Sequence, residues 1–152
     1  MKKQNLLAAA MTGMMMSAVG AAHAAPPASR ADQKSLKGQI SQRVDDKKAD
    51  DTIVLSVGEL LNITEYFVVT SAPNRRLVRT IVESIEEVVG LEHDRKPLRL
   101  EGLSEAQWVL MDYGDVVVHV FVDEMRQYYE IERLYRDVPR VEWRPDEAVA
   151  AG

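Results

Sequence analysis

The stretch from Trp108 to Val122 constrains the fold more than any other part of the chain, because its pattern predicts a β-hairpin. Two β-rich runs, Trp108–Met111 and Val116–Val122, flank the segment Asp112–Asp115, in which a glycine allows positive φ and aspartate side chains can bond turn amides. Side chains of the second run alternate between two faces, and both faces are apolar except at His119. A strand that is apolar on both faces is usually central and covered on each side, so we expect a layered α/β fold.

The size and composition of the chain limit the classes of protein it can belong to. Its 152 residues, 46% of them hydrophobic, suffice for one domain with a real core but not for a second full domain. The 24 acidic and 19 basic residues give a net charge of −5, which argues against coating nucleic acid by bulk electrostatics. The chain has no cysteine, so any chemistry would have to use Asp, Glu, His, Ser or Tyr.

The first 25 residues have the layout of a secretory signal peptide. Lys2 and Lys3 precede an uncharged run from Leu6 to Ala22, and small residues follow at Ala22-His23-Ala24. The alternative is a low-complexity extension that begins at a start site chosen too far upstream. With the polar linker Pro26–Asp32 added, residues 1–32 are excluded from the fold, and the domain is predicted over residues 33–140.

The hydrophobic pattern predicts the elements that precede the hairpin. Apolar residues at every fourth position from Leu36 to Val44 predict an amphipathic helix ending near Lys48. A second helix is predicted to begin after an N-cap at Asn74 and to stop at Gly90. The remaining segments are strands at Ile53–Val57, Tyr66–Thr70 and Leu98–Glu101, and connections at Gly58–Thr64 and Leu91–Pro97. With the hairpin, this gives a mixed sheet of about five strands flanked by helices.

The residues after the hairpin predict one more helix. Asp123 is the expected N-cap, and the apolar stripe continues to about Tyr135, with Pro139 marking the end. The tail over residues 141–152 has too little apolar pattern to assign and is expected to be flexible.

Few side chains form a pattern that suggests catalysis. Asp112 and Asp115, with Asp123 or His119, could collect a divalent cation such as Mg²⁺. Aspartates are common in turns for backbone reasons alone, so a structural role is favoured. His119 lies among valines without a Ser or Cys partner, which favours a buried, neutral histidine bonded to a neighbour over a metal ligand or a general base.

Two further features fit either contact with a partner or an ordinary structural role. Arg75, Arg76 and Arg79 stand in the first turn of a predicted helix, where cations oppose the helix dipole. An acidic partner would explain them, although a solvated face with ion pairs to Glu83 is favoured. Trp108 fits either a partner anchor or a core residue, and the sequence does not distinguish the two.

Six ordered segments carry a resemblance to a known family. They are Asp45–Ala49, Ile63–Phe67, Ser71–Arg76, Glu101-Gly102 with Trp108, Asp112–Phe121 and Tyr129–Leu134. Together, over about Leu36 to Val141, the chain resembles the ribosomal silencing factor family, also called Iojap-related. Glu65 stands where the family usually has Asp, a small change in reach within a turn.

The resemblance implies both a fold and a function. The implied fold is nucleotidyltransferase-like without working catalytic residues, and no cofactor or metal is expected. The implied function is repression of translation in starvation. The protein would bind the large ribosomal subunit through ribosomal protein fourteen on its intersubunit face and block joining of the small subunit. Neither a membrane nor sequence-specific nucleic acid binding is expected, and whether the free protein is a homodimer stays open.

Because a ribosome-binding protein must meet its ribosome, the resemblance also implies a cytoplasmic location, in conflict with the signal-like residues 1–25. Two alternatives follow from the residues themselves: an Mg²⁺-dependent nucleotidyltransferase-like enzyme using Asp112 and Asp115, or an exported domain of unknown ligand.

The expected partner surface lies on the hairpin edge, because Trp108 and Leu110 share one face of a strand. Its predicted residues are Trp108, Leu110, Tyr113, Arg126 and Tyr129. The motif predicted to be structural consists of Asp112, Gly114, Asp115 and His119.

Overall fold

The computed structural model describes residues 30–141 and 143, with side chains from Leu36 onward. The strands are β1 Asp50–Ser56, β2 Tyr66–Ala72, β3 Arg99–Glu101, β4 Trp108–Asp112 and β5 Val116–Val122. The helices are α2 Arg30–Asp46, α3 Gly58–Leu61, α4 Arg75–His93, α5 Asp123–Tyr129 and α6 Ile131–Leu134. The signal-like residues 1–25 lie outside the described part of the chain. Of the helices described, none is long and apolar enough to cross a membrane.

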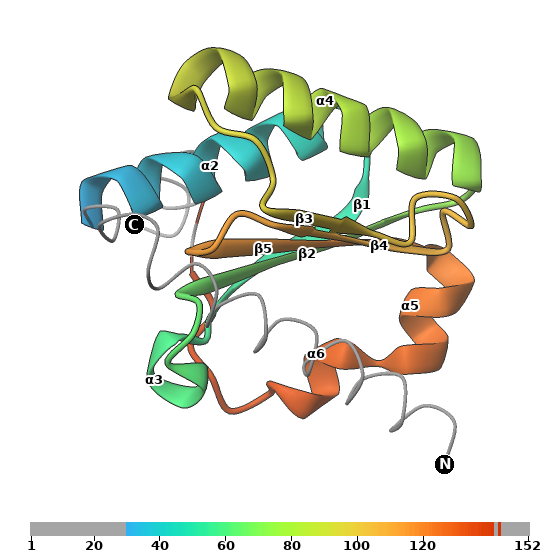
Figure 1. The fold of residues 1–152 in the computed structure, drawn as a ribbon. Coiled ribbons are helices and arrows are strands. Elements are labelled where there is room, and N and C mark those ends of the chain that lie inside the picture. Colours follow the sequence, from blue (N-terminus) through green and yellow to red (C-terminus); the bar gives the residue numbers. More distant parts are fainter. Residues whose placement is uncertain (1–29, 142, 144–152) are drawn as a thin grey trace, which may run out of the picture.

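The strands form one mixed sheet in the order β1-β2-β5-β4-β3 (Figure 1). β2 and β5 are parallel, whereas the other neighbouring pairs are antiparallel. β4 and β5 form the predicted hairpin, with Trp108 opposite Phe121 and Leu110 opposite His119. The third of five positions belongs to β5, which confirms the prediction of a central strand.

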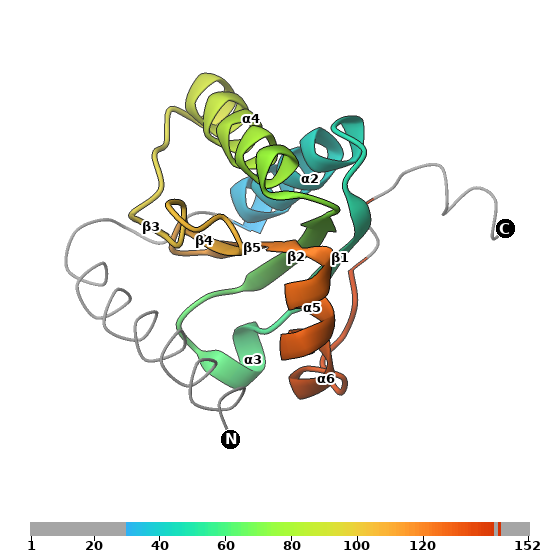
Figure 2. The ribbon, with the colours of Figure 1, turned by 90° about the vertical axis from the view of Figure 1, so that its right-hand side faces the viewer.

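The helices lie on both faces of the sheet. α2 and α4 cover one face, and α3, α5 and α6 lie on the opposite side (Figures 1 and 2). Val116, Val118 and Val120 belong to the core under α2 and α4, whereas Val117 and Phe121 belong to the core on the other face. The alternation predicted for β5 therefore places its side chains in two separate cores, as expected for a strand covered on both sides.

The prediction for α4 is correct at its beginning and wrong at its end. The side-chain oxygen of Asn74 accepts a 2.9 Å hydrogen bond from the Leu77 amide, which confirms the N-cap. The helix does not stop at Gly90 but continues to His93, where Asp94 adopts the left-handed conformation and caps it. The last turn of α4 is bonded to α2, because the His93 ring forms a hydrogen bond with the Gln39 side chain. A tertiary contact thus prolongs the helix past its glycine.

The single helix predicted from Asp123 to Tyr135 is instead two short helices. Glu130, at φ 46°, interrupts the helical path between α5 and α6. Asp123 is the first residue of α5 rather than its cap, and no side chain caps that end. The break lets Ile131 and Tyr135 turn back into the second core, where both are buried.

At the start of the tail predicted over residues 141–152, Val141 and Trp143 bond the outer edge of β1, as does Pro139 just before it. The Ser56 amide donates to the Pro139 carbonyl at 2.9 Å, and the Val141 amide donates to the Val54 carbonyl at 2.8 Å. The Trp143 indole donates to a further β1 carbonyl at 3.2 Å. This segment covers backbone groups that an edge strand would otherwise expose. Residues 142 and 144–152 lie outside the described part.

Candidate partner-binding site

A continuous cluster of rings runs from the second core to the surface of α5. This aromatic cluster consists of Phe67, Trp108, His119, Phe121, Tyr128, Tyr129 and Tyr135. Trp108 lies at its centre, with ring centroids 5.0 Å from Phe121 and 4.9 Å from Tyr129. Tyr128, 5.0 Å from Tyr129, is 44% exposed. The cluster therefore presents aromatic surface to solvent from a base that is fixed in the core.

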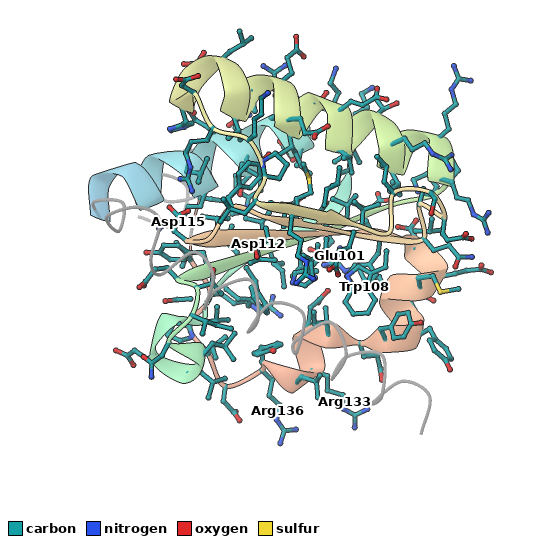
Figure 3. The ribbon with its side chains drawn as sticks, in the orientation of Figure 1. Glu101, Trp108, Asp112, Asp115, Arg133 and Arg136 are labelled. Carbon is teal, nitrogen blue, oxygen red and sulfur yellow. The ribbon has the colours of Figure 1, made fainter. Side chains whose placement is uncertain are left out.

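Trp108 is half-buried at the start of β4, on the α5 side of the sheet (Figure 3). Its indole Nε1 donates a 3.1 Å hydrogen bond to Nδ1 of His119. A tryptophan N–H can only donate, so Nδ1 of His119 must be unprotonated. The orientation of the half-buried ring is therefore fixed by a residue of the neighbouring strand.

His119 is 1% exposed, and its burial lowers the pKa of the imidazole to about 3. The ring is therefore neutral at ordinary pH and carries its proton on Nε2. Nε2 has no hydrogen-bond partner among the described residues, and the ring lies edge to face against Phe67 at 4.7 Å. The structure thus contains the buried, neutral and neighbour-bonded histidine that the strand pattern predicted.

Two residues of the predicted partner surface are buried. Leu110 is 4% exposed and belongs to the core below the sheet, whereas Tyr113 is 1% exposed and belongs to the core under α2 and α4. Burial raises the pKa of the Tyr113 hydroxyl, and the nearby Glu86 carboxylate adds to this. Placing these two residues on one surface was wrong, because side chains alternate along β4 and Tyr113 shares the face of Val109 and Met111, opposite to that of Leu110.

Arg126, predicted at the rim of the surface, forms an internal clamp. Its side chain is 10% exposed and donates to the backbone carbonyls of Asp50 and Asp51 at 3.0 and 2.7 Å. It also donates to the Ser71 hydroxyl at 3.1 Å and pairs with Glu132. The guanidinium therefore joins α5 to β1, β2 and α6, and it is not available as a partner contact.

The turn carboxylates bond the protein itself. Asp112 Oδ1 accepts a 2.7 Å hydrogen bond from the amide of Gly114, which has φ 89°. Both oxygens of Asp115 accept from the Arg95 guanidinium, at 2.6 and 3.2 Å. Arg95 also bonds the Tyr113 carbonyl and so anchors the connection from α4 to the hairpin. These contacts account for both aspartates as parts of the turn.

The side chains considered for Mg²⁺ are not brought together. Asp112 and Asp115 stand at the hairpin turn (Figure 3). Asp123 follows the opposite end of β5. A strand of that length separates its ends by roughly 20 Å. Within residues 36–141 and 143, no group of three or more His, Asp or Glu side chains is arranged to hold a metal ion.

Gly102 has a geometric role that the sequence did not reveal. It adopts φ 82°, and a Cβ on it would lie 2.1 Å from the carbonyl oxygen of Trp108. A side chain at this position would collide with the backbone that begins β4. This glycine therefore lets the β3–β4 connection pass close to the residue that presents the indole.

A family comparison and the similar proteins of known name point to the same family. The family described as "Ribosomal silencing factor during starvation" matches residues 30–151. A ribosomal silencing factor of Bacillus subtilis is 36% identical over 107 residues, covering 70% of this chain and 90% of the relative. One from Halalkalibacterium halodurans is 39% identical over 99 residues, covering 65% and 84%.

A solved structure shares the fold. The crystal structure of a Chromobacterium violaceum protein gives a TM-score of 0.64 at 29% identity, covering 67% of this chain and 84% of that one. The family match extends over all of the described residues and so includes the hairpin, the aromatic cluster and the turn aspartates. The chain therefore belongs to the ribosomal silencing factor family.

Proposed function

We propose that this protein represses translation by binding the large ribosomal subunit and blocking the joining of the small subunit. Family membership supports a role in ribosomal silencing. The proposed binding partner is ribosomal protein fourteen of the large subunit, on its intersubunit face. The observation that carries the proposal on this chain is the half-buried Trp108, held by His119 at the centre of the aromatic cluster and stacked beside Tyr129.

The proposed contact surface consists of Trp108, Tyr128 and Tyr129. Large, stiff aromatic side chains are the residues that interface hot spots favour, and they lose little conformational freedom on binding. Two of the three are half-buried and Tyr128 is 44% exposed, so the surface is partly ordered before the partner arrives. Repression then requires only that the bound chain occupies space that the small subunit needs.

The proposal includes no catalytic step. The carboxylates of Asp112 and Asp115, on which an Mg²⁺-dependent nucleotidyltransferase would depend, bond the Gly114 amide and Arg95. Incubation of the purified protein with nucleoside triphosphates and Mg²⁺ tests that alternative. Nucleotide transfer that disappears in an Asp112→Asn, Asp115→Asn variant would establish an enzyme instead.

Sedimentation with separated ribosomal subunits tests the proposed function. We expect the tagged chain to cosediment with large subunits and not with small ones, and to reduce the fraction of joined particles when both are mixed. Binding to large subunits without any effect on joining would remove the blocking mechanism. Absence of binding would contradict the proposal that the large subunit is the partner.

The site of action is tested separately. The proposal places the chain in the compartment that holds the ribosomes, so we expect residues 1–25 not to direct export. The mass of the N-terminal peptide from protein expressed in its own cells, together with fractionation, decides between retention and export. A mature chain that begins near Ala25 and is found outside the cytoplasm would contradict the proposal.

A further inference from the structure

We propose that Arg75, Arg76 and Arg79 form a second contact surface, the α4 arginine surface, that binds backbone phosphates of ribosomal RNA beside the protein partner. The inference rests on the proposed function, since it assumes that the chain docks on a large subunit. It adds a partner of different chemistry, recognised by charge rather than by apolar contact.

The three arginines lie together on the outer side of α4. All three are exposed, whereas Val78, Ile81 and Val82 of the same helix are buried against the sheet. Arg79 follows Arg76 by three residues and Arg75 by four, a spacing that places side chains next to each other on a helix surface. The sheet side of the helix is thus filled by packing, and the three arginines lie on its exposed side.

These cations are poorly compensated within the protein. The first turn of α4 has no acidic residue, so the positive charges face the positive end of the helix dipole. The ion pair to Glu83 that the sequence suggested is not formed, and none of the three arginines is within 4.0 Å of a carboxylate among residues 36–141 and 143. The chain as a whole carries a charge of −5, so acidic residues for such pairs are not scarce.

The ligand groups are the guanidinium groups and not the helix amides. Asn74 already accepts from the Leu77 amide through its side chain and from the Val78 amide through its carbonyl. Arginine binds phosphate through two parallel N–H bonds, and its planar fork suits phosphate oxygens. Contacts of this kind carry no sequence information, so they agree with the expectation that the protein does not read a nucleotide sequence.

The α4 arginine surface lies at the same end of the sheet as Trp108. Arg79 donates a 2.9 Å hydrogen bond to the Ser104 carbonyl in the β3–β4 connection. That connection leads directly into β4, and the Gln107 carbonyl accepts from the Val122 amide at the end of β5. The start of α4 and α5 therefore lie at one end of the sheet, above and below it (Figure 1), and Trp108 lies on the α5 side (Figure 3). A surface made of protein and RNA can contact both.

The salt dependence of binding tests the inference. Cosedimentation of the full chain with large subunits is measured over a series of KCl concentrations for the parent and for an Arg75→Gln, Arg76→Gln, Arg79→Gln variant. Each lost phosphate contact should make the slope of log affinity against log salt shallower by about one. We expect the slope to become shallower by about two to three, with weaker binding at low salt. A parental slope and affinity in this variant would overturn the inference.

Two control variants separate a phosphate surface from a general charge effect. An Arg75→Lys, Arg76→Lys, Arg79→Lys variant keeps the charge and should keep most of the slope. A Lys96→Gln, Arg136→Gln, Arg140→Gln variant removes the same charge from exposed positions elsewhere and should keep the parental slope. An equal loss of slope in this last variant would contradict a local surface. Thermal melting should change little in the α4 variant, because loss of the exposed Arg79–Ser104 hydrogen bond is offset by removing cations from the positive end of a helix.

The identity of the partner is tested by placing a photo-crosslinking amino acid at position 76. Crosslinks to ribosomal RNA are expected, whereas crosslinks only to protein would replace the RNA by an acidic protein surface and overturn the inference. If the parent chain binds no large subunits at all, the proposed function fails and this inference fails with it. If the parent binds large subunits and the Arg75→Gln, Arg76→Gln, Arg79→Gln variant has the same salt dependence, this inference fails and the proposed function is retained.

Discussion

The indole of Trp108 and the imidazole of His119 form one hydrogen-bonded pair across the β4–β5 hairpin, with one ring half-buried and the other 1% exposed. Because Nδ1 of His119 is the acceptor, a residue that no partner can reach determines how the indole is presented. His119 therefore acts on the contact surface through Trp108, as a positioning residue.

Replacement of Trp108 by alanine should reduce both binding and stability. The half-buried ring stacks on Phe121, so we expect a loss of about 2 kcal/mol of unfolding free energy, less than for a fully buried tryptophan. Binding to large subunits should weaken by roughly thirtyfold, about 2 kcal/mol. Trp143→Ala is the matched control, because Trp143 packs beside β1 and should affect stability alone. A folded Trp108→Ala chain that binds large subunits with parental affinity would contradict the proposed contact surface.

Two substitutions at His119 should have different effects. Glutamine offers an oxygen that can accept from the indole, so His119→Gln should retain binding. His119→Leu removes the acceptor and should weaken binding by about tenfold, or 1.4 kcal/mol. Its unfolding free energy should change little, since leucine leaves the indole N–H without its partner but also removes the unpartnered Nε2–H. Equal binding by the leucine and glutamine variants would show that the pair does not position the indole.

The stability of the protein should fall below about pH 6.5 through His119. Burial lowers the pKa of His119 to about 3, whereas an unfolded histidine titrates near 6.5. Between these values the unfolded chain binds a proton that the folded chain does not. The contribution of His119 to the free energy of unfolding is therefore complete above pH 6.5 and decreases by up to about 1.4 kcal/mol per pH unit as the pH falls.

Urea unfolding at pH 7, 6 and 5 measures this dependence in the parent and in His119→Gln. The carboxylates and the remaining histidines contribute to both proteins, so the difference between the two curves isolates His119. We expect the parent to lose more stability than the variant over this range. Parallel curves would contradict a neutral, buried His119.

Arg126→Ala should destabilise the fold rather than act on binding alone. The substitution removes the donor to the Asp50 and Asp51 carbonyls and leaves Glu132 without its partner. Breaking such a partly buried network costs about 2 to 4 kcal/mol of unfolding free energy. Arg133→Ala, at an exposed position in α6, should change stability by no more than about 0.5 kcal/mol. Similar melting temperatures for the two variants would disprove the clamp.

Two glycines should respond in opposite directions to alanine. Gly102→Ala places a Cβ against the Trp108 carbonyl at a positive φ and should cost about 2 kcal/mol or more. Gly90→Ala places a Cβ in open space within α4, so it should stabilise the protein by up to about 1 kcal/mol. Thermal melting of both variants checks the pair, and a stable Gly102→Ala protein would contradict the close approach.

The features that the sequence predicted correctly depend on local patterns. Alternating valines identified β5 as a strand with two apolar faces, and the turn residues fixed the hairpin register. The Asn74 cap follows from its position before an apolar stripe. In these cases the residues that decide the structure are neighbours in the chain, so periodicity and capping rules suffice.

The errors arise where a distant segment decides. Arg126 looks like a rim residue on an amphipathic helix, yet its partners lie more than 50 residues earlier, in β1 and β2. Tyr113 is the exception, because alternation along β4 already predicts its face: it shares the core of Val109 and Met111, opposite to Leu110. Glu130 has no helix-breaking character of its own, and the burial of Ile131 and Tyr135 determines the break. Such outcomes depend on the assembled sheet and cannot be predicted from local patterns.

The contacts of Pro139, Val141 and Trp143 with β1 bear on how the protein can be shortened for experiments. A chain that ends before Pro139 would leave the outer carbonyls and amides of β1 without their present partners, including the Ser56 amide and the Val54 carbonyl. An uncovered strand of this kind templates pairing with a second molecule. Shortened versions should therefore retain Trp143, and affinity tags at the C-terminus should be joined beyond it, because a domain cut at the end of its last helix would be prone to self-association.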